Sequence, residues 1–179
     1  KLFHLGQRSI SNKGYYEAVT WSFTDQKIDD LTNDSTNPIF IINPISKELN
    51  VLRRSIFSNL LFYLKKNHDR GFQDISLFEI GPVFYGKKPG EQQTIIGAVK
   101  SGQINKKSWS EKTRNVDIFD MKTDVIKTLI EMGINYDHMI VSDKSKNCYH
   151  PGRSGSVNLK TGNGVLLAQF GEIHPSVIS

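Results

Sequence analysis

The chain has 179 residues, with 23 Lys and Arg against 18 Asp and Glu, 37% hydrophobic residues and a single cysteine. A chain of this length can form one domain that buries roughly 70% of its unfolded surface. The lone Cys148 excludes an internal disulfide and a paired-cysteine zinc or redox site, and it predicts a reducing, cytoplasmic compartment. No apolar run approaches the roughly 18 residues that a membrane helix needs. The net charge of +5 favours an acidic partner only weakly.

The first third of the chain carries two strand patterns. Tyr15 to Phe23 is rich in aromatic and β-branched residues, which favour strands. Ile39 to Ile42 is a short apolar run that ends at Asn43-Pro44, so we expect a buried strand that stops at the proline.

Residues 55–68 carry the clearest helix pattern. Ser55 is a suitable N-cap, and Gly71 suits the exit of the chain from the helix. Phe62 points away from the apolar stripe and is either a singly exposed aromatic residue or a partner contact. The stripe itself, at helical spacing, consists of Ile56, Phe57, Leu60, Leu61 and Leu64.

The second half predicts further strands and one more long helix. Strands are expected at Ile75 to Tyr85 and Thr94 to Val99, joined by a turn rich in glycine and lysine. Asp120 is the expected cap of a helix that ends at Gly133. The inward-facing residues of that helix are predicted to be Val125, Ile126, Leu129 and Met132.

The end of the chain predicts a hairpin. Val157 to Lys160 and Val165 to Gly171 flank the turn Thr161-Gly-Asn-Gly164, whose Gly-Asn centre accepts positive φ. Strands and helices do not alternate regularly, so we expect an α+β fold, a mainly antiparallel β-sheet flanked by helices. We expect a single module over residues 1–179. Because the chain begins at Lys1 and not at Met, we expect this module to be a fragment of a longer polypeptide.

Local motifs for catalysis or metal binding fail on physical grounds. Gly81-Pro-Val-Phe-Tyr-Gly-Lys-Lys88 resembles a phosphate-binding loop, but Pro82 removes a backbone amide and Lys88 replaces the magnesium-binding hydroxyl. The five histidines show no HxxxH or HExxH spacing. Three aspartates at 117, 120 and 124 are better explained as helix-start residues that satisfy free amides. The sequence therefore predicts neither a catalytic residue nor a metal site in this chain.

A series of rigid polar motifs remains, and their order along the chain is informative. They are Asn43-Pro-Ile-Ser-Lys-Glu48, Leu52-Arg-Arg-Ser55, Asn67-His-Asp-Arg70, Leu77-Phe-Glu-Ile-Gly-Pro-Val-Phe84, Trp109, Phe119-Asp-Met-Lys122, His150-Pro-Gly-Arg-Ser154 and Gly171-Glu-Ile-His-Pro175. In this order the series resembles the β subunit of bacterial phenylalanyl-tRNA synthetase, in the module that copies the class II synthetase catalytic fold. The resemblance covers nearly the whole chain and implies a class II aminoacyl-tRNA synthetase-like sheet flanked by helices.

The resemblance also bears on catalysis. Active class II sites hold ATP with two arginines, whose guanidinium groups match phosphate oxygens bidentately. At the nearest counterpart of the first, this chain has Glu79 in Phe78-Glu-Ile-Gly81, and no Arg lies between Gly71 and Lys112. At the spacing of the second it has Ala168. We therefore expect this fragment alone to be inactive.

The resemblance implies a scaffold that packs on the catalytic α subunit in an (αβ)2 phenylalanine–tRNA ligase. In that enzyme the α subunit would bind ATP and magnesium and the whole enzyme would bind tRNA, whereas this fragment would hold no cofactor. Arginines and turn residues of the motifs would then serve the interface or fix the fold. These residues are Asn43, Pro44, Arg53, Arg54, Asn67, Arg70, Glu79, Gly81, His150, Pro151, Gly152, Arg153, Glu172 and His174.

Two other functions stay open. A stand-alone nucleic-acid-binding (tRNA-binding) module would use the loop from Lys106 to Arg114 and the segment from Lys65 to Arg70 as a phosphate track, with strongly salt-dependent affinity. An active adenylate-forming enzyme is the other, and the missing arginines argue against it.

Overall fold

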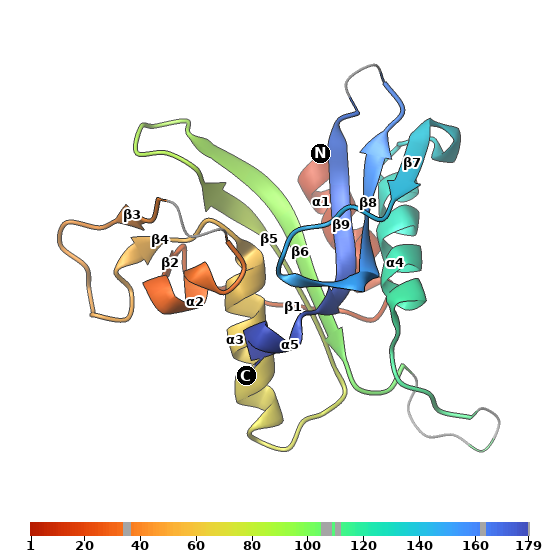
Figure 1. Cartoon of the computed structure of the whole chain (residues 1–179), viewed down its shortest axis with the longest axis horizontal. Helices are drawn as coiled ribbons and strands as arrows, with labels where there is room; N and C mark the ends of the chain where they lie inside the picture. The colour runs from red at the N-terminus through yellow and green to blue at the C-terminus, as the bar shows by residue number, and fades with distance from the viewer. Residues whose placement is uncertain (34–36, 105–108, 110–111, 162–163, 179) are drawn as a thin grey trace. The chain divides into compact units, whose positions relative to one another are not determined.

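The structure is a computed structural model that describes residues 1–33, 37–104, 109, 112–161 and 164–178 (Figure 1). The chain divides into two compact units. One, here called the central unit, comprises residues 15–106; the other, the terminal unit, comprises residues 1–14 and 107–179. The single module over residues 1–179 stays a prediction.

The central unit is built on a three-stranded sheet with the order β1-β5-β6. The long strands β5 (Ile75–Phe84) and β6 (Gln92–Ser101) form an antiparallel hairpin, and β1 (Tyr16–Glu17) lies parallel to β5. A smaller antiparallel sheet has the order β2-β4-β3. Its strands are β2 (Phe23–Thr24), β3 (Ile39–Phe40) and β4 (Val51–Leu52).

Helix α3 (Ile56–His68) covers the β5–β6 hairpin (Figure 1). As predicted, the Ser55 side chain caps it, accepting a hydrogen bond from the Phe57 amide at 3.1 Å, and Gly71 leaves the helix with a φ of 90°. The predicted apolar stripe is confirmed, because it forms the core with Val83 and Val99. The helix lies so close to β6 that a Cβ at Gly97 would be 3.0 Å from a methyl carbon of Ile56.

The predicted strand from Tyr15 to Phe23 is wrong in its middle. Only its two ends pair, as β1 and the start of β2. Between them the Asn59 amide donates hydrogen bonds to the Thr20 hydroxyl and the Trp21 carbonyl, both at 3.0 Å. This side chain from α3 thus binds a segment that lies between the two strands and belongs to neither.

The terminal unit is a second antiparallel sheet, with the order β7-β8-β9, combined with helices from both ends of the chain. Helix α4 packs on β8 and β9, and helix α1 packs on α4. The elements are α1 (Leu2–Ser11), α4 (Ile118–Glu131), the 3-10 helix η1 (Tyr136–His138), β7 (Met139–Ser142), β8 (Tyr149–Leu159), β9 (Leu166–Ile173) and α5 (Pro175–Ile178).

Helix α4 begins earlier than the sequence predicted. Asp117, and not Asp120, is the N-cap, and its carboxylate accepts from the amides of Phe119 and Asp120. The Asp120 side chain in turn accepts from the Asp117 amide at 2.9 Å, which completes a capping box. Several aspartates lie close together at this helix start, and spacing alone did not identify which of them is the cap.

The hairpin of β8 and β9 is confirmed, although β8 begins at Tyr149, well before the predicted start. The predicted Gly-Asn turn centre, residues 162–163, lies outside the described residues. Antiparallel pairs dominate the sheets, and helices pack on the β5–β6 hairpin and on β8 and β9, so the α+β prediction is confirmed. Within the described part of the chain, no helix has both the length and the apolar character to cross a membrane.

Candidate functional site

A buried ion pair between Arg53 and Glu79 lies at the centre of the predicted motif residues of the central unit. Arg53 is 1% exposed, and its Nη1 lies 2.6 Å from Oε1 of Glu79. The same nitrogen donates to the Thr20 hydroxyl at 2.9 Å, and Nε donates to the Pro82 carbonyl at 2.9 Å. Thr20 donates to the other Glu79 oxygen at 2.7 Å. Both charges are therefore hydrogen-bonded within the protein, as buried charges require.

The backbone around Arg53 explains why it is directed inward. Its amide donates to the Ser22 carbonyl at 2.9 Å, and its carbonyl accepts from the Phe84 amide at 3.1 Å. Gly81 on β5 leaves the space that the guanidinium occupies, since a Cβ there would lie 2.5 Å from Nη2. Arg53, Glu79 and Gly81, three residues predicted separately, thus form one contact group.

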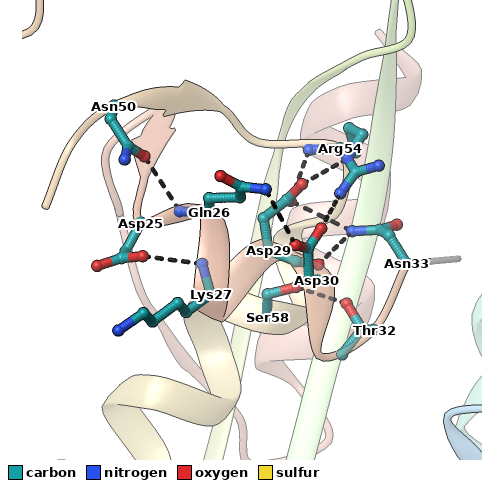
Figure 2. Close-up of polar contacts among 10 residues, drawn as sticks. All are labelled: Asp25, Gln26, Lys27, Asp29, Asp30, Thr32, Asn33, Asn50, Arg54 and Ser58. Carbon is teal, nitrogen blue, oxygen red and sulfur yellow. Dashed lines mark hydrogen bonds and ion pairs between the residues drawn. The ribbon is translucent and has the colours of Figure 1, made fainter. Parts of the chain in front are cut away.

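Arg54 forms a second charged cluster, with helix α2 (Gln26–Asp30) (Figure 2). Its Nε lies 2.5 Å from Oδ2 of Asp29, which is fully buried, and its Nη2 lies 2.6 Å from Oδ1 of Asp30. The Arg54 amide also donates to Asp29 Oδ1, at 3.0 Å. Burial lowers the pKa of the Arg54 guanidinium, but the hydrogen bonds and charges of the two aspartates outweigh burial and raise that pKa overall.

The same cluster fixes both ends of α2 (Figure 2). The Asp25 carboxylate caps the helix by accepting from the Lys27 amide at 2.8 Å, and the Asn50 side chain accepts from the Gln26 amide at 3.1 Å. Further along, the hydroxyls of Thr32 and Ser58 are 2.5 Å apart and join the segment after α2 to α3. Helix α2 is therefore bound to its neighbours by side chains on both of its flanks.

An apolar groove of about 150 Å³ lies beside α2 and α3. Asn59 lines it and donates hydrogen bonds to the Thr20 hydroxyl and the Trp21 carbonyl. We call it the α2–α3 groove. Its lining residues are Thr20, Trp21, Phe23, Thr24, Asp25, Ile28, Glu48, Leu49, Asn59, Phe62 and Tyr63.

The other predicted residues of the central unit lie away from these charged clusters. Asn43 and Pro44 are exposed in the segment between β3 and β4. The Asn67 side chain donates to the Tyr63 carbonyl at 2.7 Å near the end of α3, and its own carbonyl accepts from the Phe72 amide at 3.1 Å. Arg70 is exposed just beyond that helix.

The predicted residues of the terminal unit gather where β8 bulges. The ladder pairs Tyr149 with Ile173 and then Ser154 with Gly171, so residues 150–153 lie opposite Glu172 alone. There Arg153 Nε lies 2.7 Å from Oε2 of Glu172. Nδ1 of His150 accepts from the Gly152 amide at 3.2 Å, and the rings of His150 and His174 are 6.4 Å apart. Pro151 is an exposed residue of the same bulge.

The polar side chains of both charged clusters and of the β8 bulge are satisfied by partners within the described part of the chain. Among the described residues, no group of three His, Cys, Asp or Glu side chains is placed to hold a metal ion. No buried side-chain nitrogen or oxygen there lacks a hydrogen-bond partner. The geometry of Arg53 and Arg54 therefore favours a structural use of both charges.

Sequence reasoning missed the acceptors of these clusters, Asp29 and Asp30, and the linking residues Thr20 and Asn59. The signal for α2 was present, because Asp25 precedes Gln-Lys-Ile-Asp-Asp, a capping residue before a short polar helix. Asp29 and Arg54 are 25 positions apart in the sequence, and no motif spacing indicated that they pair.

Comparison with known proteins identifies the family. The family described as "Phenylalanyl tRNA synthetase beta chain CLM domain" matches residues 1–179. The phenylalanine–tRNA ligase β subunit of Paramagnetospirillum magneticum is 36% identical over 97% of this chain and 21% of its own length. That of Rickettsia bellii is 38% identical over 96% of this chain and 19% of its own length. The chain thus spans about a fifth of these relatives.

Solved structures give the same fold at low sequence identity. A pyrrolysyl-tRNA synthetase of Desulfitobacterium hafniense superposes with a TM-score of 0.66 and 16% identity, over 94% of this chain and 54% of its own. An ATP phosphoribosyltransferase regulatory subunit/histidyl-tRNA synthetase of Bacillus halodurans gives 0.60 and 11% identity, over 79% of this chain and 35% of its own. The fold is that of class II aminoacyl-tRNA synthetases. With the match over its whole length, the chain belongs to the family of phenylalanyl-tRNA synthetase β-chain CLM domains.

Proposed function

We propose that this chain is a noncatalytic scaffold module of a cytoplasmic phenylalanine–tRNA ligase. It packs on the catalytic α subunit in an (αβ)2 enzyme that attaches phenylalanine to its tRNA. The α subunit binds ATP and magnesium, and this module binds neither. Membership of the β-chain family supports this proposal, and the internal use of Arg53 is the observation that carries it.

A bound phosphate and the Glu79 carboxylate would compete for the same Arg53 guanidinium. A triphosphate site needs arginine forks that face the ligand. Arg53 is 1% exposed and bonded to Glu79, Thr20 and Pro82, so binding a phosphate would first have to break a buried ion pair. Arg54 is likewise paired with Asp29 and Asp30. The sequence resemblance aligns Glu79 with an ATP-binding arginine of active class II sites, and a carboxylate that is paired with Arg53 offers no cation to a polyphosphate.

Light scattering after size-exclusion chromatography tests the proposal, with the chain alone and with the cognate α subunit. The scaffold function predicts a stable mixed complex at moderate salt. It also predicts no ATP–pyrophosphate exchange by the chain alone, and exchange by the complex. A folded chain that forms no complex with α, or that catalyses exchange alone, contradicts the proposal.

A second candidate function is binding of tRNA by the module itself. Lys65, Lys66 and Arg70 favour it, because all three are exposed at or just beyond the end of α3. Against it, Arg114 is paired with Asp120 at 2.6 Å, and Lys106 and Lys107 lie outside the described residues. The test is the affinity for tRNA at several salt concentrations. If the basic residues contact phosphates, the logarithm of the binding constant falls linearly with the logarithm of the salt concentration. Affinity that is absent at low salt contradicts it.

A further inference from the structure

The α2–α3 groove exposes aromatic surface that the central unit does not use in its own core. Trp21 and Phe62 line it and are 63% and 44% exposed. Phe62 lies on α3 away from the apolar stripe that packs on the sheet. Aromatic side chains that line a hollow are typical anchors of protein interfaces, because they bury a large area with few rotatable bonds.

The size of the groove restricts what can occupy it. At about 150 Å³ it is smaller than the roughly 300–1,000 Å³ of pockets that bind drug-sized ligands and cofactors. An apolar cavity of about this volume accommodates one benzene ring. The groove therefore fits one large apolar side chain better than a nucleotide.

The charge of the groove restricts its partner further. Among the described residues that line it are two carboxylates, Asp25 and Glu48, and no lysine or arginine. This is opposite in sign to the net charge of +5 of the whole chain. Glu48 is exposed, and a hydrogen bond from the Ser46 side chain lowers the pKa of its carboxyl, which favours the charged form. A cationic partner is attracted here and a polyanion is repelled.

The walls of the groove are fixed before any partner arrives. Ile28 lies on α2, which Arg54 holds through Asp29 and Asp30 (Figure 2). The opposite wall belongs to α3, and Asn59 of that helix holds the Trp21 segment in place. A preformed groove binds without the entropic cost of ordering its own side chains.

From these observations we propose that the α2–α3 groove is a docking site for the α subunit. Its occupant is a segment with one large apolar side chain next to a lysine or arginine. The apolar side chain enters between Trp21 and Phe62, and the cation faces Asp25 and Glu48. This inference rests on the proposed scaffold function and deepens it by naming a surface that meets α.

Site-directed photocross-linking tests the position of the partner. Phe62→Cys and Phe72→Cys are each labelled with benzophenone maleimide in the native polypeptide and mixed with purified α. The labelling is selective within this chain, because its single cysteine, Cys148, is buried. Phe72 is the matched control, since it is a 63% exposed phenylalanine of the same unit that does not line the groove.

The expected result is a cross-link from position 62, and not from position 72, to an α peptide that contains an apolar residue beside Lys or Arg. A complex that forms without any cross-link from position 62 overturns the docking site and leaves the scaffold function standing. A cross-link from position 62 to a second copy of this chain also overturns it. Failure of the unlabelled protein to bind α overturns both proposals.

Affinity measurements give an independent readout. Phe62→Ser is expected to raise the dissociation constant for α about tenfold or more, as anchor residues do, whereas Phe72→Ser leaves it unchanged. Glu48→Lys is expected to weaken binding several-fold and to reduce its sensitivity to salt. Circular dichroism verifies that each variant is folded. Equal dissociation constants for Phe62→Ser and Phe72→Ser contradict the docking site.

Discussion

The two units each contain an ion pair between an arginine and a glutamate, with almost the same N–O distance and opposite surroundings. Arg53 and Glu79 are 2.6 Å apart with side chains that are 2% and 5% exposed. Arg153 and Glu172 are 2.7 Å apart with side chains that are 53% and 42% exposed. The N–O distances alone would predict equal contributions to stability. Burial predicts different contributions, because a buried charge that loses its partner cannot turn to water, whereas an exposed one can.

The two pairs also differ in what surrounds them. Thr20 and Pro82 complete the hydrogen bonds of the buried pair, which links the segment before β2, the end of β4 and strand β5. The exposed pair spans only the bulge between β8 and β9. We therefore expect the first pair to determine the stability of its unit and the second to contribute little.

The largest effect is expected from Arg53→Ala. This change leaves the Glu79 carboxylate buried without its cation, and breaking one partner of such a pair costs about 3–5 kcal/mol. Chemical denaturation followed by circular dichroism measures the loss. The double variant Arg53→Met with Glu79→Leu is the control, because removal of both charges leaves no unpaired ion, and it should recover most of the stability. A single variant as stable as the wild type contradicts the account.

Arg54→Ala should cost less, about 1.5–3 kcal/mol, the range for hydrogen bonds to charged groups. Asp29 is fully buried, but it keeps donors from the Arg54 backbone amide and the Asn33 side chain. The same denaturation experiment measures the change, and Arg70→Ala, at an exposed arginine of the same unit, is the matched control. A cost equal to that of Arg70→Ala would mean that the cluster of Figure 2 is not what holds α2.

Each ion pair has a nearby glycine, which gives a matched pair of substitutions. Gly81→Ala places a methyl group 2.5 Å from the Arg53 guanidinium, and crowding a packed site in this way costs about 1–3 kcal/mol. At Gly152 the nearest atom to a new methyl group is 3.8 Å away, in ordinary contact with the His150 ring, so Gly152→Ala should be nearly neutral. Thermal unfolding compares the two. Equal melting temperatures of the two variants would mean that a methyl group at position 81 is no more crowded than one at position 152.

A third pair, between Lys13 and Glu131, has intermediate exposure, with side chains 11% and 48% exposed. Hydrogen bonds from Lys13 and Ser9 lower the pKa of the Glu131 carboxyl. A lowered folded-state pKa adds stability that is present above the unfolded-state pKa and is lost as pH falls through the folded-state pKa. Relative to Glu131→Gln, the wild type should therefore lose stability between about pH 5 and acid pH, which melting curves at several pH values measure. A difference that does not change with pH contradicts this.

The smallest effect is expected from Arg153→Ala. Exposed pairs contribute about 0–1 kcal/mol, and Glu172 can turn to water when the arginine is removed. Denaturation in low and in high salt checks this, because any contribution should shrink as salt rises. A loss near that of Arg53→Ala would show that exposure does not explain the difference between the two pairs.

Regular elements with a strong local pattern were predictable from the sequence. Helix α3 was predicted with its Ser55 cap and its apolar stripe, because capping and helical spacing are local signals. Strands β5 and β6 were also predicted. The predicted range is one residue longer than β5 and several residues shorter than β6. The opening helix α1 was not predicted.

The contacts of the site were predictable only in part. The order of the motifs indicated the family and named Arg53, Glu79 and Gly81, but not that the three meet. Arg53 and Glu79 are 26 positions apart, and a pairing of this kind depends on the register of separate strands. Thr20 and Asn59 were not named at all, because neither residue type signals its partner in the sequence.

The proposed scaffold function requires that the buried charges of this module take no part in the chemistry of α. ATP–pyrophosphate exchange by the αβ complex tests this, with wild-type β and with β that carries Arg53→Met plus Glu79→Leu. We expect the double variant to fold, to bind α and to support exchange at the wild-type rate, because the buried pair only fixes the fold. A folded, assembled complex that has lost exchange would overturn the proposed function, since it would place these charges in the reaction.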